Sequence, residues 1–275
     1  MLYVIATPIG NLEDITFRAL DTLKKCDYIL CEDTRHSVHL LSHYQISKPL
    51  KSFHKFNETA KEQEIIHDLE KGLCVGLITD AGTPGISDPG AKLIKLCVEK
   101  KLPVVSIPGA CAAITALSCS GFDSDRFQFI GFLPRKPGEL RKELIEILMF
   151  SGTTICYEAP TRMVATLEKL DALDPARTLS IARELTKKFE EVLRGTPKEL
   201  IDQWKEQRLK GEAVLLISGR KKIQGEEWQE LTPEQHVELM QNAYGLSRQE
   251  AIKITAELRG VSKRDVYNLV EKKEE

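Results

Sequence analysis

The amino-acid sequence predicts an α/β protein with two α/β domains, the first built on a parallel sheet and the second on a mixed sheet, and a small helical C-terminal appendix. Three observations support this prediction. Strand-like and helix-like segments alternate through residues 1–117, the connections between them are short, and the strands are continuous apolar runs. Strands of this kind are typical of a parallel sheet that helices cover on both faces.

The size and composition are those of a globular protein. The 275 residues suffice for two domains of about 150 residues each, and the hydrophobic share of 42% and charged share of 29% are ordinary. The formal net charge of −2 indicates neither nucleic acid nor a membrane surface as a partner. No apolar run approaches the ~20 residues that span a bilayer, and the chain does not open with the basic region of a signal peptide.

The use of cysteine indicates the cellular compartment. The chain has seven cysteines, an odd number, and no C-x-x-C pair occurs. Most of them lie within apolar runs. We therefore expect buried, reduced thiols in a cytoplasmic protein that has no membrane partner.

The first domain is expected to cover residues 1–117. Its helices carry apolar residues at helical spacing, for example Ile15, Ala19 and Leu23. Strands are expected over residues 2–6, 28–31, 74–78 and 103–107, and helices over 14–26, 36–44, 58–71, 91–100 and 111–118.

The second domain is expected to cover residues 118–222, and its less uniform connections predict the mixed sheet. A small helical domain is expected over residues 223–275, where Ser247 and Glu250 fit a capping box. In the second domain, strands are expected over residues 127–133, 153–158, 178–182 and 213–219, with a short edge element at 192–195, and helices over 139–150, 161–170 and 197–205.

Special backbone residues gather after three strands of the first domain. T-D-A-G-T-P-G-I-S-D-P-G follows the strand at 74–78, while Pro8, Gly10, Pro108 and Gly109 follow two others. Ligands of open parallel sheets bind outside such strand ends, and glycine lets the backbone approach a ligand closely. A structural turn is the alternative for any single loop, but three such junctions would converge on one crevice. No G-x-G-x-x-G, P-loop or G-x-S-x-G motif occurs.

Polar side chains follow the second expected strand. Glu32, Asp33 and Arg35 would form a polar wall of the crevice, or the acids simply favour the N-terminus of the next helix through its dipole. His39 and His43 have a spacing that could chelate a metal, but no carboxylate motif accompanies them, and we expect no metal.

Basic and aromatic residues are interleaved in S-F-H-K-F-N-E, residues 52–58, which follows Lys48 and Lys51. This composition suits contacts with phosphates and bases, and an amphipathic connector is the alternative. The charged residues 183–191 follow the strand at 178–182, where a solvated edge is the alternative to a role in a site.

Several long motifs in chain order resemble one family. They are A-T-P-I-G-N-L-E-D-I-T, L-C-E-D-T-R-H, T-D-A-G-T-P-G followed by S-D-P-G, I-P-G-A, G-F-L-P-R-K, Y-E-A-P-T-R and A-R-E-L-T-K-K-F-E-E. Together they are similar to the ribosomal RNA small subunit methyltransferase I group of the tetrapyrrole methylase superfamily. The resemblance covers about residues 1–220, and the helical tail also fits.

The resemblance implies a fold of tetrapyrrole methylase type, a cofactor and a reaction. S-adenosyl-L-methionine would lie in the cleft between the two domains, and the reaction would be 2′-O-methylation of a cytidine ribose in the decoding region of 16S rRNA. The partner would be 16S rRNA in the small ribosomal subunit, and the chain would form a homodimer. A porphyrin or corrin C-methyltransferase and a non-catalytic ribosome-binding protein of the same fold are the alternatives.

Two loops depart from the superfamily's pattern. The first loop, Thr7 to Asn11, lacks the first glycine of G-x-G-P-G, which is typical of the rRNA branch and counts against a porphyrin substrate. In the third loop, Cys111 stands where a hydroxyl group is common.

The loops, the charged segments and the resemblance together supply candidate site residues. For the cofactor they are Pro8, Gly10, Asp80, Ala81, Gly82, Pro84, Gly85, Ile86, Ser87, Pro108, Gly109, Cys111, Ala112, Glu158 and Leu185. For the RNA substrate they are Lys51, His54, Lys55, Arg135, Lys136, Arg162 and Arg183, with further basic residues in the tail. A ribose hydroxyl is a poor acid, so a base or a cation should assist it; the candidates are Asp33, Glu32, Arg35 and Lys187.

Overall fold

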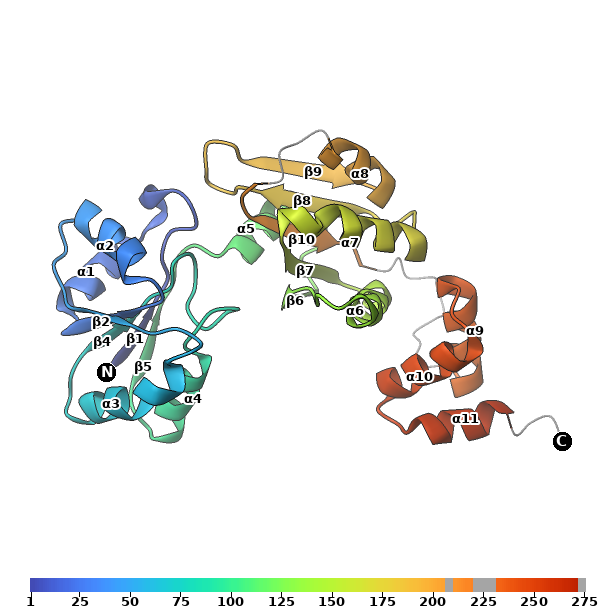
Figure 1. The fold of residues 1–275 in the computed structure, drawn as a ribbon, viewed down its shortest axis with the longest axis horizontal. Coiled ribbons are helices and arrows are strands. Elements are labelled where there is room, and N and C mark those ends of the chain that lie inside the picture. The colour runs from blue at the N-terminus through green and yellow to red at the C-terminus, as the bar shows by residue number, and fades with distance from the viewer. Residues whose placement is uncertain (206–209, 220–230, 272–275) are drawn as a thin grey trace. The chain divides into compact units, whose positions relative to one another are not determined.

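The computed structural model describes residues 1–205, 210–219 and 231–271, and its contacts divide the chain into two compact units. The first unit consists of Met1–Ala116 together with Glu184–Glu191. The second consists of Leu117–Arg183 and Val192–Glu275. The ribbon in Figure 1 shows the α/β layers of each unit.

The first unit is built on a five-stranded sheet in which every pairing is parallel, as the sequence predicts. The strand order is β3-β2-β4-β1-β5. The elements in chain order are β1 (Leu2–Ile5), the 3₁₀ turn η1 (Leu12–Asp14), α1 (Phe17–Lys25), β2 (Tyr28–Cys31), α2 (Thr34–His43), β3 (Leu50–Ser52), α3 (Glu58–Glu70), β4 (Val75–Leu77), α4 (Ala91–Glu99), β5 (Val104–Ile107) and α5 (Ala112–Ser120), whose last four residues belong to the second unit.

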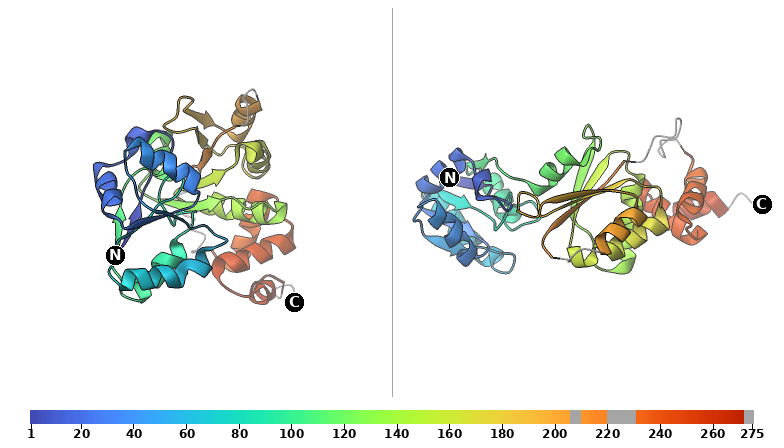
Figure 2. Two further views of the ribbon diagram at one scale, coloured as in Figure 1. Left: turned by 60° about the vertical axis from the view of Figure 1, so that its left-hand side comes forward. Right: turned by 90° about the horizontal axis from the view of Figure 1, so that it is seen from above.

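Helices cover both faces of this sheet, because successive strand residues alternate between two apolar cores. On one face, Leu23 of α1 and Leu41 of α2 pack with Ile5 of β1. On the other, Ile66 of α3 and Leu93 of α4 share a cluster with strand residues. Figures 1 and 2 show α1 and α2 on one side of the strands and α3 and α4 on the other.

The neighbouring strands β1 and β4 form the topological switch point of the sheet. From β1 the chain passes through α1 to β2, and from β4 it passes through α4 to β5 on the opposite side. The helices that follow these two strands therefore lie on opposite faces. A crevice opens outside the carboxyl ends of strands at such a point, and it is where open α/β sheets bind ligands.

Two details of the first unit differ from the sequence prediction. Strand β3 was not predicted: it has three half-buried residues at the sheet edge, too few to show a period. The helix expected over residues 14–26 is interrupted, because the Thr16 side chain accepts a hydrogen bond from the Ala19 N–H and so starts α1 at Phe17. Before it, Asn11 caps the short turn η1 by accepting from Glu13 N–H.

The second unit holds the mixed sheet, in the order β6-β7-β10-β8-β9. β6 and β7 are parallel, whereas β10 is antiparallel to both β7 and β8, which confirms the prediction. The elements are β6 (Phe127–Phe132), α6 (Pro137–Met149), β7 (Thr153–Glu158), α7 (Pro160–Leu173), β8 (Leu179–Arg183), β9 (Glu191–Gly195), α8 (Pro197–Lys205), β10 (Ala213–Ile217), α9 (Pro233–Tyr244), α10 (Arg248–Arg259) and α11 (Lys263–Glu271).

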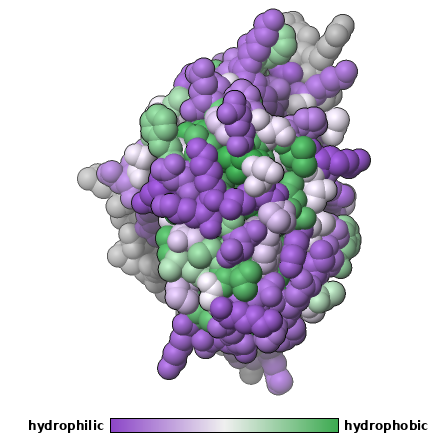
Figure 3. All heavy atoms as spheres, turned by 90° about the vertical axis from the view of Figure 1, so that its left-hand side faces the viewer, coloured by the Kyte–Doolittle hydropathy of each residue, from purple (hydrophilic) through white to green (hydrophobic). Residues whose placement is uncertain are grey.

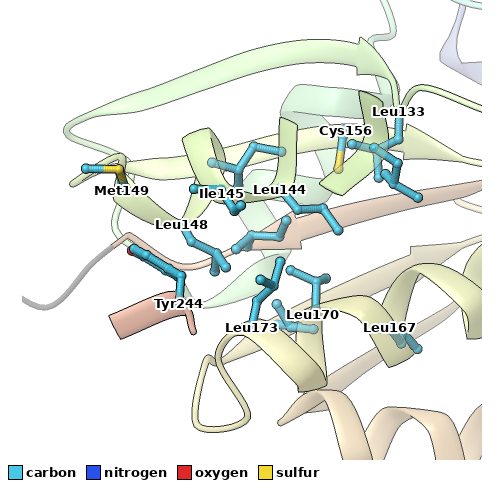
Figure 4. Close-up of a cluster of buried hydrophobic side chains, with 14 of the residues drawn as sticks. Leu133, Leu144, Ile145, Leu148, Met149, Cys156, Leu167, Leu170, Leu173 and Tyr244 are labelled. Carbon is cyan, nitrogen blue, oxygen red and sulfur yellow. The ribbon is translucent and has the colours of Figure 1, made fainter. Parts of the chain in front are cut away.

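The C-terminal helices pack against the rest of the second unit, to which they belong. Tyr244 of α9 belongs to the same buried cluster as Leu148 and Met149 of α6, and Figure 4 shows these side chains near one another. At the surface, Arg141 pairs with Glu250 (3.2 Å) and Lys142 with Glu257 (2.8 Å). The capping box at Ser247 and Glu250 is formed. Independent folding of residues 223–275 as a third domain stays a prediction.

No helix in the described ranges is both long enough and apolar enough to cross a bilayer. All seven cysteines lie within these ranges, and none forms a disulfide. Figure 3 shows one face of the molecule, on which hydrophilic side chains predominate and hydrophobic groups form smaller patches.

Gly90 is a position where a side chain should be costly. It has a φ of +118°, and an added Cβ would lie 2.6 Å from Cδ2 of the buried Leu77. We expect Gly90→Ala to lower the free energy of unfolding by about 1–3 kcal/mol more than Gly72→Ala. Gly72 is the matched control, because its φ is +89° but nothing lies within 4 Å of its added Cβ. Urea denaturation measures both, and equal losses would contradict the steric argument.

Candidate functional site

The loops that follow β1 and β4 are held together by paired backbone hydrogen bonds. Thr7 N–H donates to Gly82 O (2.9 Å), and Gly82 N–H donates to Thr7 O (3.1 Å). The hydroxyl of the buried Thr7 also donates to Thr79 O (3.0 Å). Residues more than seventy positions apart are thus fixed side by side at the switch point.

The loop after β5 joins the same cluster. The Thr83 hydroxyl donates to Ala110 O (3.4 Å). Gly109 passes close to β1, because a Cβ added there would lie 2.9 Å from the Cβ of Ala6. The three strand-end loops that the sequence singles out are therefore brought together in the first unit. Gly82, Gly85 and Gly90 all have positive φ, which accounts for the glycines of the β4 loop.

The candidate cofactor residues fall into two groups. Those from Pro8 to Ala112, and Leu185, belong to the first unit. Glu158 belongs to the second unit, at the end of β7, where its buried carboxylate accepts from Ala159 N–H (2.8 Å) and the Thr166 hydroxyl (2.8 Å). The structure thus gathers the candidates of the first group, and it gives Glu158 partners within its own unit.

The polar groups of the first-unit loops fit a ligand that donates hydrogen bonds. Asp80 is half-buried at the end of β4, and its Oδ1 accepts from Asp33 N–H (3.3 Å). Pro108 and Gly109 are exposed. S-adenosyl-L-methionine carries an ammonium group and ribose hydroxyls, which need acceptors of this kind, so the residues present suit that cofactor.

A pocket of about 490 Å³ lies at the ends of β2, β3 and β4, and every residue that lines it belongs to the first unit. Its volume lies within the range of small-molecule sites. The lining residues are Glu32, Asp33, Thr34, Arg35, Ser52, His54, Lys55, Phe56 and Asp80. This pocket brings together candidate catalytic residues and two of the candidate RNA-binding residues.

Asp33 and Arg35 form an exposed pair at the N-terminus of α2. The Asp33 carboxylate accepts from the Arg35 N–H (2.8 Å) and from its guanidinium Nη2 (2.7 Å). These hydrogen bonds lower the pKa of Asp33 to about 2. Asp33 is therefore a weak proton acceptor, and its carboxylate fixes the position of the Arg35 guanidinium.

Asp88 is a titratable residue of the β4 loop that the sequence analysis missed. Burial raises its pKa to about 6, and the nearby carboxylates of Glu32 and Asp80 add to the rise, whereas Thr79 and Lys55 oppose it. A carboxyl group with a pKa near neutrality can exchange a proton at physiological pH. The signal in the sequence was an aspartate between two prolines in a loop already suspected of binding a ligand.

The segment Glu184–Glu191 packs in the first unit against the β1 loop. A Cβ added to Gly10 would lie 2.4 Å from Cγ of Lys187 and 2.9 Å from Oγ1 of Thr186. The Lys187 Nζ donates to Glu184 Oε1 (3.0 Å). Glu184 and Thr186 both have positive φ, an uncommon conformation for residues other than glycine. Gly10 is thus required because the Lys187 stem crosses it.

Thr186 is a second residue that the sequence analysis did not single out. Its hydroxyl is buried and has no hydrogen-bond partner in the described part of the chain. Strained backbone together with an unsatisfied polar group is typical of functional sites. The only sequence signal was the charge density of residues 183–191, which does not mark a threonine.

The candidate RNA-binding arginines of the second unit have structural partners. Arg162 donates to Leu133 O (3.3 Å) and Pro134 O (2.6 Å), and it pairs with Glu158 (3.3 Å). These contacts fix the turn that precedes Arg135 and Lys136, both of which are exposed. The guanidinium of Arg183 donates to Lys210 O at 3.2 and 3.1 Å.

Lys51 is the remaining candidate RNA-binding residue. Lys51 pairs with Glu64 (2.7 Å), and its ammonium lies 4.1 Å from the centre of the Tyr28 ring.

Within the described ranges, no group of three or more His, Cys, Asp or Glu residues is placed to hold a metal ion.

The fold and the loops at its switch point define a class of protein. The sequence profile of the Tetrapyrrole (Corrin/Porphyrin) Methylases matches residues 1–201. Among solved structures, the uroporphyrin-III C-methyltransferase of Thermus thermophilus complexed with S-adenosyl homocysteine is similar, with a TM-score of 0.54 and 16% identity. That similarity covers 79% of this chain and 96% of the other. The architecture is therefore that of the tetrapyrrole methylases.

Curated relatives narrow the assignment. The chain is 46% identical over 271 residues to the ribosomal RNA small subunit methyltransferase I of Halalkalibacterium halodurans, which covers 98% of this chain and 93% of that protein. It is 47% identical over 220 residues to the protein of the same name from a Hydrogenobaculum species, covering 79% of this chain and 95% of that one. The chain belongs to the ribosomal RNA small subunit methyltransferase I family, as the sequence motifs indicate.

Gly10→Ala should lower the free energy of unfolding by about 1–3 kcal/mol, because its methyl group would overlap the Lys187 stem. In a Lys187→Ala background the same substitution should cost clearly less, and denaturation of the four proteins measures the difference as a double-mutant cycle. Gly138→Ala is the control, because nothing lies within 4 Å of its added Cβ. An equal cost in both backgrounds would show that Lys187 is not the obstacle.

Asp88→Asn should stabilise the protein at pH 7. The folded-state pKa of about 6 lies above the ordinary value of 3.8, so the fold favours protonated Asp88. Its ionisation therefore reduces stability progressively as the pH rises from about 4 to about 6. The gain from Asp88→Asn should be full above pH 6 and should vanish near pH 4.

Thermal unfolding of wild type and variant from pH 4 to pH 8 measures this gain. Asp21→Asn, at an exposed position of α1, controls for the loss of a negative charge. A gain that does not depend on pH would mean that burial of the charge is not its source.

Proposed function

We propose that this chain transfers a methyl group from S-adenosyl-L-methionine to the 2′-hydroxyl of a cytidine ribose in the decoding region of 16S rRNA. The observation that carries the proposal is the joining of three strand-end loops beside a polar pocket, in a member of a family named for methylation of small-subunit ribosomal RNA. The small ribosomal subunit is the proposed partner, and the cytoplasm is the proposed location.

S-adenosyl-L-methionine is the cofactor, in keeping with the methyltransferase family to which the chain belongs. When bound, it supplies an electrophilic methyl group on a sulfonium sulfur. The loops after β1, β4 and β5 would hold it, with Asp80 accepting from its donor groups and the glycines of the β4 loop allowing close approach of the backbone. Much of the rate then comes from fixing the two reactants in line.

The chain's own residues would assist the ribose hydroxyl. Of the two adjacent acids, Glu32 is the proposed proton acceptor, and Asp33 is proposed to act by positioning Arg35, because its carboxylate is already hydrogen-bonded to that residue. Arg35 and Lys187 are the proposed cations for the negative charge that develops on the attacking oxygen.

The RNA would be held by local basic groups, since the net charge of the chain is slightly negative. Lys51, His54 and Lys55 lie around the ends of β2 and β3, and Arg135 and Lys136 form an exposed turn of the second unit. Arg162 would contribute by fixing the position of that turn, and Arg183 would contact the RNA from the end of β8. Affinity for RNA should then fall steeply with salt, because phosphate contacts release counterions.

A tetrapyrrole substrate is the main rival, because the family profile carries that name. The relatives argue against it, since those that cover nearly the whole chain are named for methylation of small-subunit ribosomal RNA, and the first loop lacks the first glycine of the G-x-G-P-G pattern. A non-catalytic ribosome-binding protein is the other rival, but a binding module has no need of three loops joined at a switch point.

A homodimer is proposed as the assembly. In support, β6 is an edge strand of the second sheet, and its Phe127 and Phe132 are 43% and 64% exposed. Exposed edge strands readily pair with another chain. Light scattering on the purified protein would measure the mass directly.

The decisive experiment offers labelled S-adenosyl-L-methionine with two acceptors, small ribosomal subunits from an unmethylated strain and a tetrapyrrole precursor. We expect label in 16S rRNA, at one ribose whose 3′ linkage resists alkali. Label in the tetrapyrrole would support the first rival. Label in neither acceptor, despite cofactor binding, would leave the proposed substrate without support.

Glu32→Gln should lower kcat on small subunits by about 100-fold or more if Glu32 accepts the proton. Asp33→Asn should lower kcat less and should leave cofactor affinity nearly unchanged, because asparagine still caps α2 but no longer pairs with Arg35. Steady-state kinetics and calorimetric titration with S-adenosyl-L-methionine measure the two effects. Unchanged turnover in either variant would remove that residue from the mechanism.

A further inference from the structure

The ring of Phe56 is an exposed aromatic surface at the edge of the pocket. It is 98% exposed, whereas Phe53 in the same loop is 1% exposed. The loop thus buries one phenylalanine and presents the other to solvent, although burial of such a side chain is favourable by about 1.5–3 kcal/mol. Phe56 also lines the 490 Å³ pocket.

The loop that carries Phe56 is internally braced. Asn57 Oδ1 accepts from His54 N–H (2.8 Å), and Asn57 Nδ2 donates to Ser52 O (3.3 Å). The Lys61 ammonium donates to the same carbonyl (2.7 Å). The rings of His54 and Phe56 meet edge to face with centroids 6.0 Å apart. A braced loop loses little conformational freedom on binding, so Phe56 is pre-organised to receive a ligand.

The residues that line the pocket differ in exposure: Glu32, Asp33 and Asp80 are half-buried, whereas Arg35, Lys55 and Phe56 are exposed. Glu32, Asp33 and Asp80 supply carboxylates to the lining, and these would repel a phosphate group. Lys55 is exposed, and its ammonium donates to Ser87 O (3.4 Å) in the loop after β4. Carboxylates accept from the amino and hydroxyl groups of a nucleoside, so the half-buried carboxylates suit a nucleoside, and the exposed Arg35 and Lys55 suit its phosphate.

His54, which also lines the pocket, carries an unsatisfied polar atom. Its Nδ1 is buried and has no hydrogen-bond partner in the residues that the structure describes. Buried nitrogen atoms of this kind normally have a partner, so one that lacks it is a candidate for ligand contact.

We infer that this pocket receives an unpaired nucleobase of the RNA substrate, and that the base stacks on the ring of Phe56. The identification of the ligand as RNA rests on the proposed function. The pocket and the cofactor loops share Asp80, so a nucleotide bound here would lie beside the loop after β4. Aromatic side chains that stack on splayed bases are the usual means of holding single-stranded RNA.

The test compares Phe56→Ala and Phe56→Trp with wild type in the full-length chain. Phe17→Ala is the matched control, because Phe17 is 90% exposed but lies on α1, outside the pocket. The probe is a fluorescein-labelled cytidine pentaribonucleotide, followed by anisotropy. We expect Phe56→Ala to weaken binding at least about five-fold, Phe56→Trp to retain it and Phe17→Ala to leave it unchanged.

Salt dependence separates stacking from charge. The loss in Phe56→Ala should persist from 50 to about 300 mM salt, since stacking is not ionic, whereas the loss in Lys55→Ala should shrink as salt rises. Equal binding by wild type and Phe56→Ala, or no binding by wild type, would overturn the inference.

Methyl transfer to small subunits tests the proposed function separately. If wild type methylates 16S rRNA, Phe56→Ala should raise KM at least about five-fold without changing affinity for S-adenosyl-L-methionine. Transfer with an unchanged KM would refute the pocket and leave the proposed function standing. Loss of pentanucleotide binding in Phe56→Ala, together with no transfer by wild type, would support the pocket and refute the proposed function.

Discussion

The two hydrogen bonds between Thr7 and Gly82 are the constraint on which the site of the first unit depends. β1 and β4 are neighbouring strands, but the helices that follow them lie on opposite faces of the sheet. The loops after the two strands would therefore separate if no hydrogen bonds joined them. The link needs a small residue with positive φ at Gly82, and the Thr7 hydroxyl strengthens it through Thr79. Once the two loops are joined, the β5 loop and the segment that carries Lys187 can pack against them.

A consequence of this arrangement is a high density of carboxylates in a small volume. Glu32, Asp80 and Asp88 come from two strand ends, and their mutual repulsion contributes to the raised pKa of Asp88. Such a cluster opposes stability, and it is retained where function uses it. Glu32 and Asp80 of this cluster line the pocket, while Lys55, Arg135 and Lys136 are exposed.

The sequence predicts the elements well and the contacts between them poorly. Continuous apolar runs located β7 and β10 to within two residues, because buried strands have a strong composition signal. β3 was missed because three half-buried residues carry almost none. Loops rich in glycine and proline indicated the site. The packing of Lys187 on Gly10 joins residues far apart in the chain, and a local sequence pattern cannot predict such a contact. Asp88 was missed for the same reason, since its pKa depends on neighbours from other strands.

The C-terminal helices lie outside the part of the chain that the family profile matches. The profile ends at residue 201, before α9 begins. In the Hydrogenobaculum relative, the 220 aligned residues make up 95% of the protein, so that protein is too short to contain a counterpart of this whole chain. Yet α10 pairs with α6 through Arg141 and Lys142, and α6 begins directly after the basic turn at Arg135 and Lys136. If Arg135 and Lys136 hold RNA as proposed, helices that brace α6 would act on that contact without touching the reacting atoms, and this is the role that we propose for them.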